Sequence, residues 1–210
     1  MLGSDALFTQ NAFLYSKVPY NSDKDITPIL RAVEFNMVLI VRSSLNVKSL
    51  KEFVALMKKE GAQHHYGSAG AGGTTHLAME SLKQEAGFNM NHVPYKGIAP
   101  AMQDLLGGNI DALIAGASAA IAQMPSGKVR VLAIAGKQRA KALPDVPTYA
   151  EQGYPNVVSN LYLGFAAPAG TPAAVVEKFQ MDAAKVLNDR KFIEKRSEEH
   201  TSELQSHSFI

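Results

Sequence analysis

Residues 66–76 read Tyr-Gly-Ser-Ala-Gly-Ala-Gly-Gly-Thr-Thr-His, between an expected strand at 65–67 and an expected helix through Leu77, Met79 and Leu82. Glycines let the main chain approach a ligand closely and adopt positive φ. The N-terminus of the following helix offers unpaired N–H groups and a partial positive charge, which suits a carboxylate or another anion. The same glycines could instead serve tight packing alone, and a short glycine run does not decide between the two.

Two nucleotide-binding motifs can be tested on the spacing of this segment. A dinucleotide fingerprint beginning at Gly70 would need glycine or alanine at its sixth position, where the chain has Thr75. A phosphate-binding P-loop would need Gly-Lys followed by Ser or Thr, and no lysine lies between Glu60 and Lys83. Both kinds of nucleotide site are therefore excluded.

The sequence around this segment alternates short apolar runs with helical patterns. Strands are expected at 35–42, 65–67, 90–94, 110–115, 129–134 and 161–166. Alternation of strands and helices predicts an α/β fold with a largely parallel sheet. Ligands bind at the carboxyl edge of such a sheet, which places Tyr95, Lys96 and Gly116 beside the glycine segment.

Several helix ends carry capping signals. Ser49 followed by Glu52 has the spacing of a capping box, and Gly87 follows the helix after the glycine segment as a C-terminal stop. Thr171 suits an N-cap before Pro172 at the first helical position. The apolar residues expected to be buried along that last helix are Val175, Val176, Phe179 and Val186.

The composition is typical of soluble globular proteins of one large or two small domains, with 210 residues, 46% hydrophobic and 19% charged. A net charge of +2 provides no basic footprint, so nucleic acid is not an expected partner. There is no cysteine, and the histidines show no metal-ligand spacing, so neither a metal nor a cofactor is expected. No apolar run approaches the roughly 20 residues of a membrane span, and the first residues lack the features of a secretory signal.

A serine hydrolase is the nearest catalytic alternative. The segment 116–120, Gly-Ala-Ser-Ala-Ala, follows a strand and precedes a helix like a nucleophile elbow, but its last glycine is replaced by alanine. The only histidines after Ser118 are His200 and His207, near the end of the chain. A plain N-cap explains Ser118 more simply, so no enzyme activity is expected. A cytosolic ligand-sensing domain of similar architecture is a third alternative, although no DNA-binding helix pair is evident.

Six motifs follow one another in a recognisable order and spacing. They are Tyr-Gly-Ser-Ala-Gly through Thr-His-Leu at 66–77, His-Val-Pro-Tyr-Lys-Gly at 92–97, Asp-Leu-Leu-Gly-Gly at 104–108, Lys-Val-Arg-Val-Leu-Ala at 128–133, Leu-Pro-Asp-Val-Pro-Thr at 143–148 and Ala-Pro-Ala-Gly-Thr-Pro at 167–172. In these motifs the chain resembles the Bug (TctC-type) solute receptors of tripartite tricarboxylate transporters over about residues 2–195. The resemblance implies a fold like the type II periplasmic binding proteins, with two α/β lobes whose central sheets are mixed and mainly parallel.

The resemblance also implies capture of a solute rather than catalysis. A periplasmic, monomeric receptor would bind a small carboxylate-bearing solute in a cleft between its lobes and deliver it to membrane-embedded transporter subunits. The family usually begins with a signal peptide, a strand and a ligand loop upstream of anything present here, so the first lobe is expected to be incomplete. The expected organisation is a partial first lobe at 1–43, a second lobe at 44–158, a return into the first lobe at 159–195, and a disordered tail outside the family at 196–210.

The expected ligand-binding residues are dominated by the glycine segment, with one contribution from the first lobe. Ala71 and Gly73 stand where the family often has asparagine and serine, which leaves mainly backbone donors. The full set is Ser4, Ser68, Gly70, Ala71, Gly72, Thr74, Thr75, His76, Tyr95, Lys96, Gly97 and Gly116. Apolar faces that the missing elements would cover are expected to be exposed at 35–41, at 161–166 and on the helix from Thr171.

Overall fold

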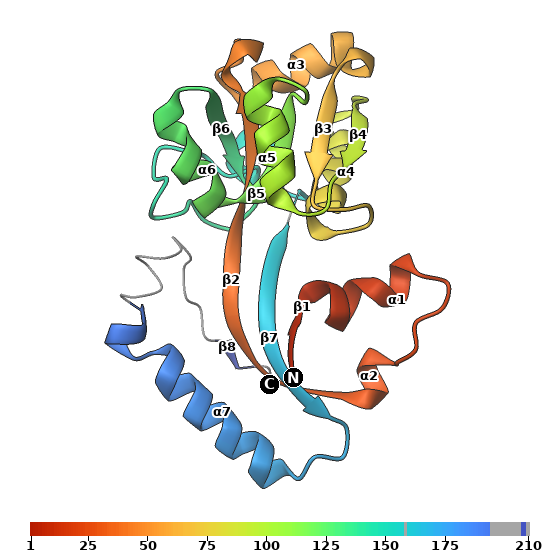
Figure 1. The fold of residues 1–210 in the computed structure, drawn as a ribbon, viewed down its shortest axis with the longest axis vertical. Helices are drawn as coiled ribbons and strands as arrows, with labels where there is room; N and C mark the ends of the chain where they lie inside the picture. Colours follow the sequence, from red (N-terminus) through yellow and green to blue (C-terminus); the bar gives the residue numbers. More distant parts are fainter. Residues whose placement is uncertain (158, 194–206, 209–210) are drawn as a thin grey trace. The chain divides into compact units, whose positions relative to one another are not determined.

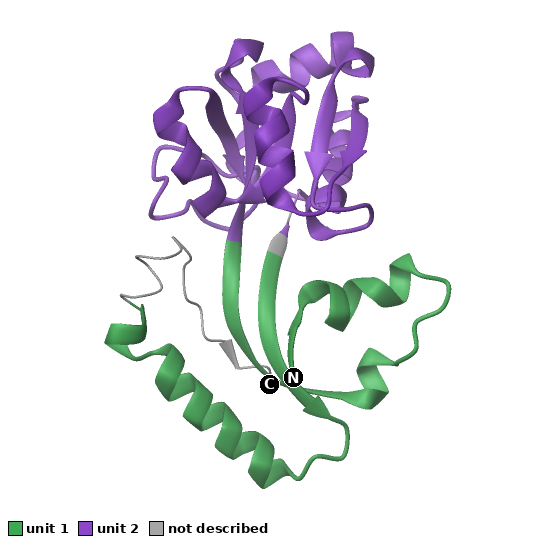
Figure 2. Cartoon of the chain, in the orientation of Figure 1, with its two compact units in different colours: residues 1–35, 161–210 green, residues 36–160 purple. Residues whose placement is uncertain are grey.

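The computed structural model describes residues 1–157, 159–193 and 207–208. The chain forms two compact units (Figure 2): unit 1 comprises Met1–Phe35 and Leu161–Ile210, and unit 2 comprises Asn36–Asn160. Unit 2 begins at Asn36, whereas the sequence analysis placed the boundary after residue 43. The boundary falls earlier because the second half of one long strand, from Met37 to Arg42, pairs with strands of unit 2.

The sheet of unit 2 is mixed. Its strands are β2 (Ile26–Arg42), β3 (His65–Ser68), β4 (Asn91–Pro94), β5 (Ala112–Gly116) and β6 (Val129–Ile134). Both β4 and β5 run parallel to β3, whereas β2 runs antiparallel to β5 and β6. The order is therefore β4-β3-β5-β2-β6, with β2 alone reversed (Figure 1). Strand β2 is longer than the expected 35–42 because its first half belongs to unit 1.

Helices connect these strands. They are α3 (Leu50–Glu60), α4 (Thr74–Ala86), α5 (Ile98–Gly107) and α6 (Ala117–Gln123), with single turns η2 (Ser43–Leu45), η3 (Gly61–Gln63), η4 (Met124–Ser126) and η5 (Ala150–Gln152). The Ser49 cap is confirmed, because its Oγ accepts from the Glu52 N–H at 3.2 Å. Gly87 ends α4 with a φ of 69°. The N-cap prediction for Ser118 is wrong, because α6 begins at Ala117 after Gly116 and Ser118 already lies in its first turn.

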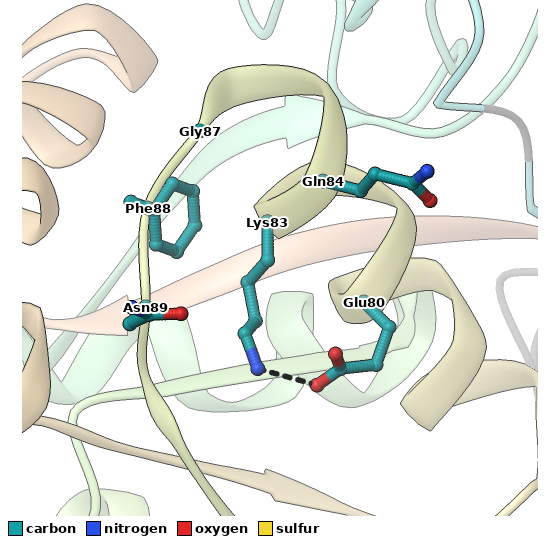
Figure 3. Close-up of a pocket in the computed structure, with 6 residues that line it drawn as sticks. All are labelled: Glu80, Lys83, Gln84, Gly87, Phe88 and Asn89. Carbon is teal, nitrogen blue, oxygen red and sulfur yellow. Dashed lines mark hydrogen bonds and ion pairs between the residues drawn. The ribbon is translucent and has the colours of Figure 1, made fainter.

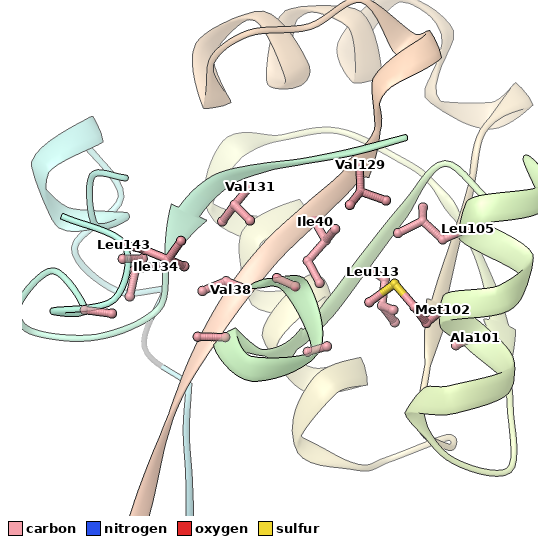
Figure 4. Close-up of a cluster of buried hydrophobic side chains, with 14 of the residues drawn as sticks. Val38, Ile40, Ala101, Met102, Leu105, Leu113, Val129, Val131, Ile134 and Leu143 are labelled. Atoms are coloured by element: carbon pink, nitrogen blue, oxygen red, sulfur yellow. The ribbon is translucent and has the colours of Figure 1, made fainter. Parts of the chain in front are cut away.

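The core of unit 2 lies around the second half of β2 (Figure 4). Val38 and Ile40 are completely buried and pack in one cluster with Leu113 of β5 and with Met102 and Leu105 of α5. Exposed apolar surface was expected at 35–41, and this is wrong from residue 37 onward. The side chains there are buried because β2 is a central strand with β5 and β6 on its two edges.

Unit 1 has a smaller sheet. Strand β1 (Leu2–Ser4) pairs antiparallel with β7 (Asn160–Pro168), which neighbours β2. A π-helical turn η1 (Ala6–Gln10) and two short helices, α1 (Asn11–Leu14) and α2 (Ser22–Asp25), follow β1. Strand β8 (His207–Ser208) pairs antiparallel with β2, and the rest of the expected disordered tail at 196–210 lies outside the described residues.

The long helix of unit 1, α7 (Ala173–Leu187), differs from its prediction in two ways. Pro172 rather than Thr171 is its N-cap, and the Thr171 hydroxyl donates to the Pro168 carbonyl at 2.7 Å. The expected buried stripe is wrong for three residues, which stay exposed although the Phe179 ring lies 5.3 Å from that of Phe165 on β7, and the buried contact of the helix is made by Leu187. The exposed fractions of these three are 56% for Val175, 43% for Phe179 and 54% for Val186. Exposed apolar surface on this helix is therefore confirmed. No helix within the described ranges is long and apolar enough to cross a bilayer.

Candidate functional site

Three loops meet at one edge of the unit 2 sheet. Strands β3, β4 and β5 are parallel and end at Ser68, Pro94 and Gly116, so their carboxyl ends lie on the same side. The main chain joins two of these loops directly. The Tyr95 N–H donates to the Ser68 carbonyl at 3.0 Å, and the Gly97 N–H donates to the Ala69 carbonyl at 3.3 Å. The expected convergence of these loops is therefore present.

The glycine loop, residues 68–73, satisfies most of its own backbone donors. The N–H groups of Ala69 and Gly70 donate to Thr75 Oγ1 at 3.0 Å and to Ser68 Oγ at 3.2 Å. The Gly73 N–H donates to the Gly70 carbonyl at 3.4 Å. The Gly72 N–H also has an acceptor inside the loop region, a ring nitrogen of His76. The sequence suggested that the backbone N–H groups of this loop point toward a ligand. In the structure most of them instead donate to acceptors in the loop itself and in α4.

Two backbone N–H groups at this loop make no hydrogen bond within the described part of the chain, those of Ala71 and Thr75. Ala71 is exposed, whereas Thr75, the second residue of α4 after Thr74, is buried. The first turn of a helix has no intrahelical partner for its N–H groups. Fewer backbone N–H groups are thus left to bind an anion than the sequence predicted, but two of them have no partner among the described residues.

Ser68 has a structural task in this loop. Its side chain is completely buried. Its Oγ donates to the Gly70 carbonyl at 2.9 Å and lies 2.7 Å from Nε2 of His92. The sequence analysis expected Ser68 among the ligand-binding residues, and in the structure its hydroxyl shapes the loop. The pair of serine and histidine presents no accessible nucleophile, because Ser68 has no exposed surface.

Two histidines stack behind the glycine loop. The ring centroids of His76 on α4 and His92 on β4 are 4.0 Å apart, and the Tyr66 ring lies 4.9 Å from that of His92. Burial lowers the pKa of His92, and the neighbouring His76 lowers it further. The sequence analysis treated these histidines as unrelated. Pairing of Tyr66 with His92 across β3 and β4 was the signal that could have connected them. The described residues hold no group of three or more acidic or histidine side chains placed to bind a metal.

Tyr95, Lys96 and Gly97 have distinct surroundings. The Tyr95 hydroxyl donates to Asp104 Oδ2 at 2.6 Å, and burial together with this carboxylate raises the pKa of Tyr95 to about 12. Lys96 is exposed and forms no ion pair with any described side chain. Gly97 is the N-cap of α5 with a φ of 107°, a conformation that favours glycine.

The remaining candidates lie outside the glycine loop and the loop after β4. Gly116 ends β5 at the same edge of the sheet and pairs with Met37. Ser118 has no hydrogen-bonded histidine among the described side chains, and those of His200 and His207 lie outside them. Ser4 belongs to unit 1, on β1 opposite Leu163, so it is not part of the loop cluster.

A shallow pocket of about 440 Å³ lies at the C-terminal end of α4 (Figure 3). Lys83 Nζ in the wall of this pocket is 2.6 Å from Glu80 Oε1, so the charges of these two side chains compensate each other. The lining residues are Glu80, Lys83, Gln84, Gly87, Phe88 and Asn89. None of them belongs to the predicted set.

Comparison with known proteins shows the family of this chain. The profile of the TctC family, described as the tripartite tricarboxylate transporter family receptor, matches residues 1–205. The chain belongs to the TctC family. The match runs past residue 195, where the sequence analysis ended the resemblance, and therefore includes part of the tail that it left outside the family.

Curated TctC-type relatives are substantially longer than this chain. The UPF0065 protein in the tcbD-tcbE intergenic region of Pseudomonas sp. (strain P51) is 32% identical over 176 residues, which cover 83% of this chain and 52% of the relative. Protein BugT of Bordetella pertussis is 30% identical over 181 residues, which cover 86% of this chain and 56% of the relative. The chain thus spans about half the length of the curated relatives it matches.

Solved TctC-type structures share the fold. R. palustris Rpa4515 with adipate superposes with a TM-score of 0.86 at 28% identity, covering 99% of this chain and 69% of that one. MatC (Rpa3494) from Rhodopseudomonas palustris with bound malate has a TM-score of 0.79 at 28% identity, covering 93% and 66%. These matches confirm the expected α/β fold of periplasmic binding proteins.

Proposed function

We propose that this chain binds a small organic solute bearing carboxylates at the carboxyl edge of the unit 2 sheet. The whole protein would act as a periplasmic receptor that delivers this solute to the membrane-embedded subunits of a tripartite tricarboxylate transporter. Membership of the TctC receptor family supports the proposal. So do two solved relatives, one with adipate and one with malate, since both ligands are dicarboxylates.

The observation that carries the proposal is a group of hydrogen-bond donors in loops that contain neither Asp nor Glu. The N–H groups of Ala71 and Thr75 lack partners among the described residues. Lys96 is exposed, and its neighbour Gly97 is hydrogen-bonded to the glycine loop. Segments 66–76, 92–98 and 115–119 contain neither Asp nor Glu. A helix N-terminus and an unpaired lysine attract a carboxylate, and no acidic side chain in these loops opposes it.

The nearest carboxylates along the chain are already held by hydrogen bonds. Glu80 accepts from the Tyr66 hydroxyl and from Lys83, and Asp104 accepts from Tyr95. Their negative charge is therefore partly compensated within the protein. The site keeps a bias toward anions at neutral pH.

Isothermal titration calorimetry with adipate, malate and adipamide tests the proposal. Adipamide has the shape of adipate without its charges, so saturable binding is expected for the two dicarboxylates and not for the diamide. Lys96→Gln should weaken adipate binding about fivefold, from roughly 1 kcal/mol for a partly exposed charge-assisted hydrogen bond. Lys58→Gln, an exposed lysine on α3, is the matched control and should leave the affinity unchanged.

Two results would overturn the proposal. One is equal affinity for adipate and adipamide, since recognition would then not depend on carboxylate charge. The other is no saturable binding of either dicarboxylate by the folded chain, with folding checked by circular dichroism.

A further inference from the structure

The hydrogen bond between the glycine loop and His76 defines the protonation state of that imidazole. The Gly72 N–H points to His76 Nδ1 at 3.0 Å. A backbone N–H can only donate, so Nδ1 must be the unprotonated ring nitrogen. His76 in this conformation is therefore neutral, with its hydrogen on Nε2.

The groups that face His76 come from three elements. His92 of β4 stacks on its ring with centroids 4.0 Å apart, and Tyr66 of β3 lies 6.3 Å away. On α4 itself, Glu80 Oε1 is 3.9 Å from His76 Nε2 and is ion-paired with Lys83. Burial lowers the pKa of His92 and raises that of Tyr66, so both are uncharged at neutral pH. The side chain of His76 is 22% exposed, so most of it is enclosed by these groups.

The two histidines anchor the glycine loop on either side of Ala71. On one side His92 contacts Ser68 Oγ, which accepts from the Gly70 N–H. On the other side His76 accepts from the Gly72 N–H. Gly70 and Gly72 have φ values of 149° and 76°, so the main chain around Ala71 is easily rearranged once an anchor is lost.

We propose that His76 is a positioning residue for the glycine loop: its Nδ1 fixes Gly72 and thereby the Ala71 N–H, and loss of this acceptor weakens solute binding. The effect on solute affinity rests on the proposed function, whereas the effect on Gly72 does not.

Two substitutions separate the acceptor from the rest of the side chain. His76→Asn places Oδ1 near the position of Nδ1, so it can accept from Gly72. His76→Leu offers no acceptor at all. Adipate affinity of the three proteins is measured by calorimetry at pH 8, where both carboxylates of adipate are ionised.

The expected pattern distinguishes the three proteins. Loss of one hydrogen bond should make His76→Leu bind adipate about fivefold more weakly than the native chain, whereas His76→Asn should stay within about twofold of it. Native affinity of His76→Leu, or an equal loss of affinity in His76→Asn and His76→Leu, would overturn the inference.

Hydrogen exchange of the Gly72 amide, measured by NMR and corrected for the intrinsic rate, provides a readout that needs no ligand. Protection of Gly72 should be present in the native chain, persist in His76→Asn and be absent in His76→Leu. If Gly72 follows this pattern and adipate does not bind, the proposed function fails and the role of His76 stands. If adipate binds and protection of Gly72 is the same in His76→Leu, the role of His76 fails and the proposed function stands.

Discussion

Replacing Ser68 with alanine removes a buried hydroxyl on which the glycine loop depends. Its Oγ lies 2.7 Å from His92 Nε2 and 2.9 Å from the Gly70 carbonyl, and it accepts from the Gly70 N–H at 3.2 Å. Ser68 is completely buried, so water cannot replace the hydroxyl without rearrangement. The variant therefore leaves polar groups of Gly70 and His92 without these partners.

The cost follows from the burial of the groups left behind. A buried donor or acceptor without a partner costs about 1–3 kcal/mol. Gly70 and His92 are both only partly buried, so water recovers part of that cost. We expect the free energy of unfolding of unit 2 to fall by about 2 kcal/mol, which raises its unfolded fraction about thirtyfold.

Urea unfolding followed by far-UV circular dichroism measures this change. Ser118→Ala is the matched control, because Ser118 is partly buried and has no hydrogen-bond partner among the described side chains. Its free energy of unfolding should change by less than about 0.5 kcal/mol. If the two variants are equally stable, the contacts of Ser68 do not hold the loop and the reasoning is refuted.

Three further predictions concern other parts of the chain. Asp111→Ala should lower the free energy of unfolding by about 3 kcal/mol in urea titrations, because Arg42 loses a buried carboxylate 2.6 Å away; a change below about 1 kcal/mol would contradict this. Tyr95→Phe removes a hydroxyl whose pKa is raised to about 12 by burial and by Asp104. The folded state holds that proton more tightly, so the contribution to stability is present below about pH 10 and lost as the pH rises through 12. Thermal melts should show the parent more stable at pH 8 and the gap closing by pH 12, and a constant gap would be inconsistent. Val186→Lys replaces a side chain that is 54% exposed in the last turn of α7 and should reduce self-association in sedimentation velocity without lowering the melting temperature. Unchanged association would show that this face of α7 does not mediate self-association.

Local signals located the elements of unit 2 well. Strand β6 runs over the predicted residues 129–134, α3 follows the predicted Ser49 cap and α4 ends at the predicted Gly87. Such patterns succeed because the side-chain period and the caps are properties of consecutive residues. The same reasoning failed on α7, where an apolar stripe is present but three of its members are exposed. Burial of a stripe depends on what packs against it, which spacing does not contain.

The candidate site was predicted in outline and missed in its hydrogen bonds. The topology of an α/β sheet was enough to bring the glycine loop together with Tyr95 and Gly97. The sequence did not indicate that Ser68, Thr75 and His76 accept most of the loop's N–H groups. Those bonds depend on the rotation of α4 about its axis and on the path of the loop.

The sequence by itself determined where unit 2 forms its strands and helices and which edge of the sheet gathers glycine, hydroxyl and lysine groups. It did so because hydrophobic period, caps and glycine conformations act over a few neighbouring residues. Only the tertiary structure decided that His92 stacks on His76 and that, among the described residues, the Ala71 N–H has no acceptor whereas the N–H groups of Gly70 and Gly72 do. That outcome required β4 to pair with β3 and α4 to turn one face toward both, because hydrogen bonds and ring contacts depend on ångström-scale distances between separate elements.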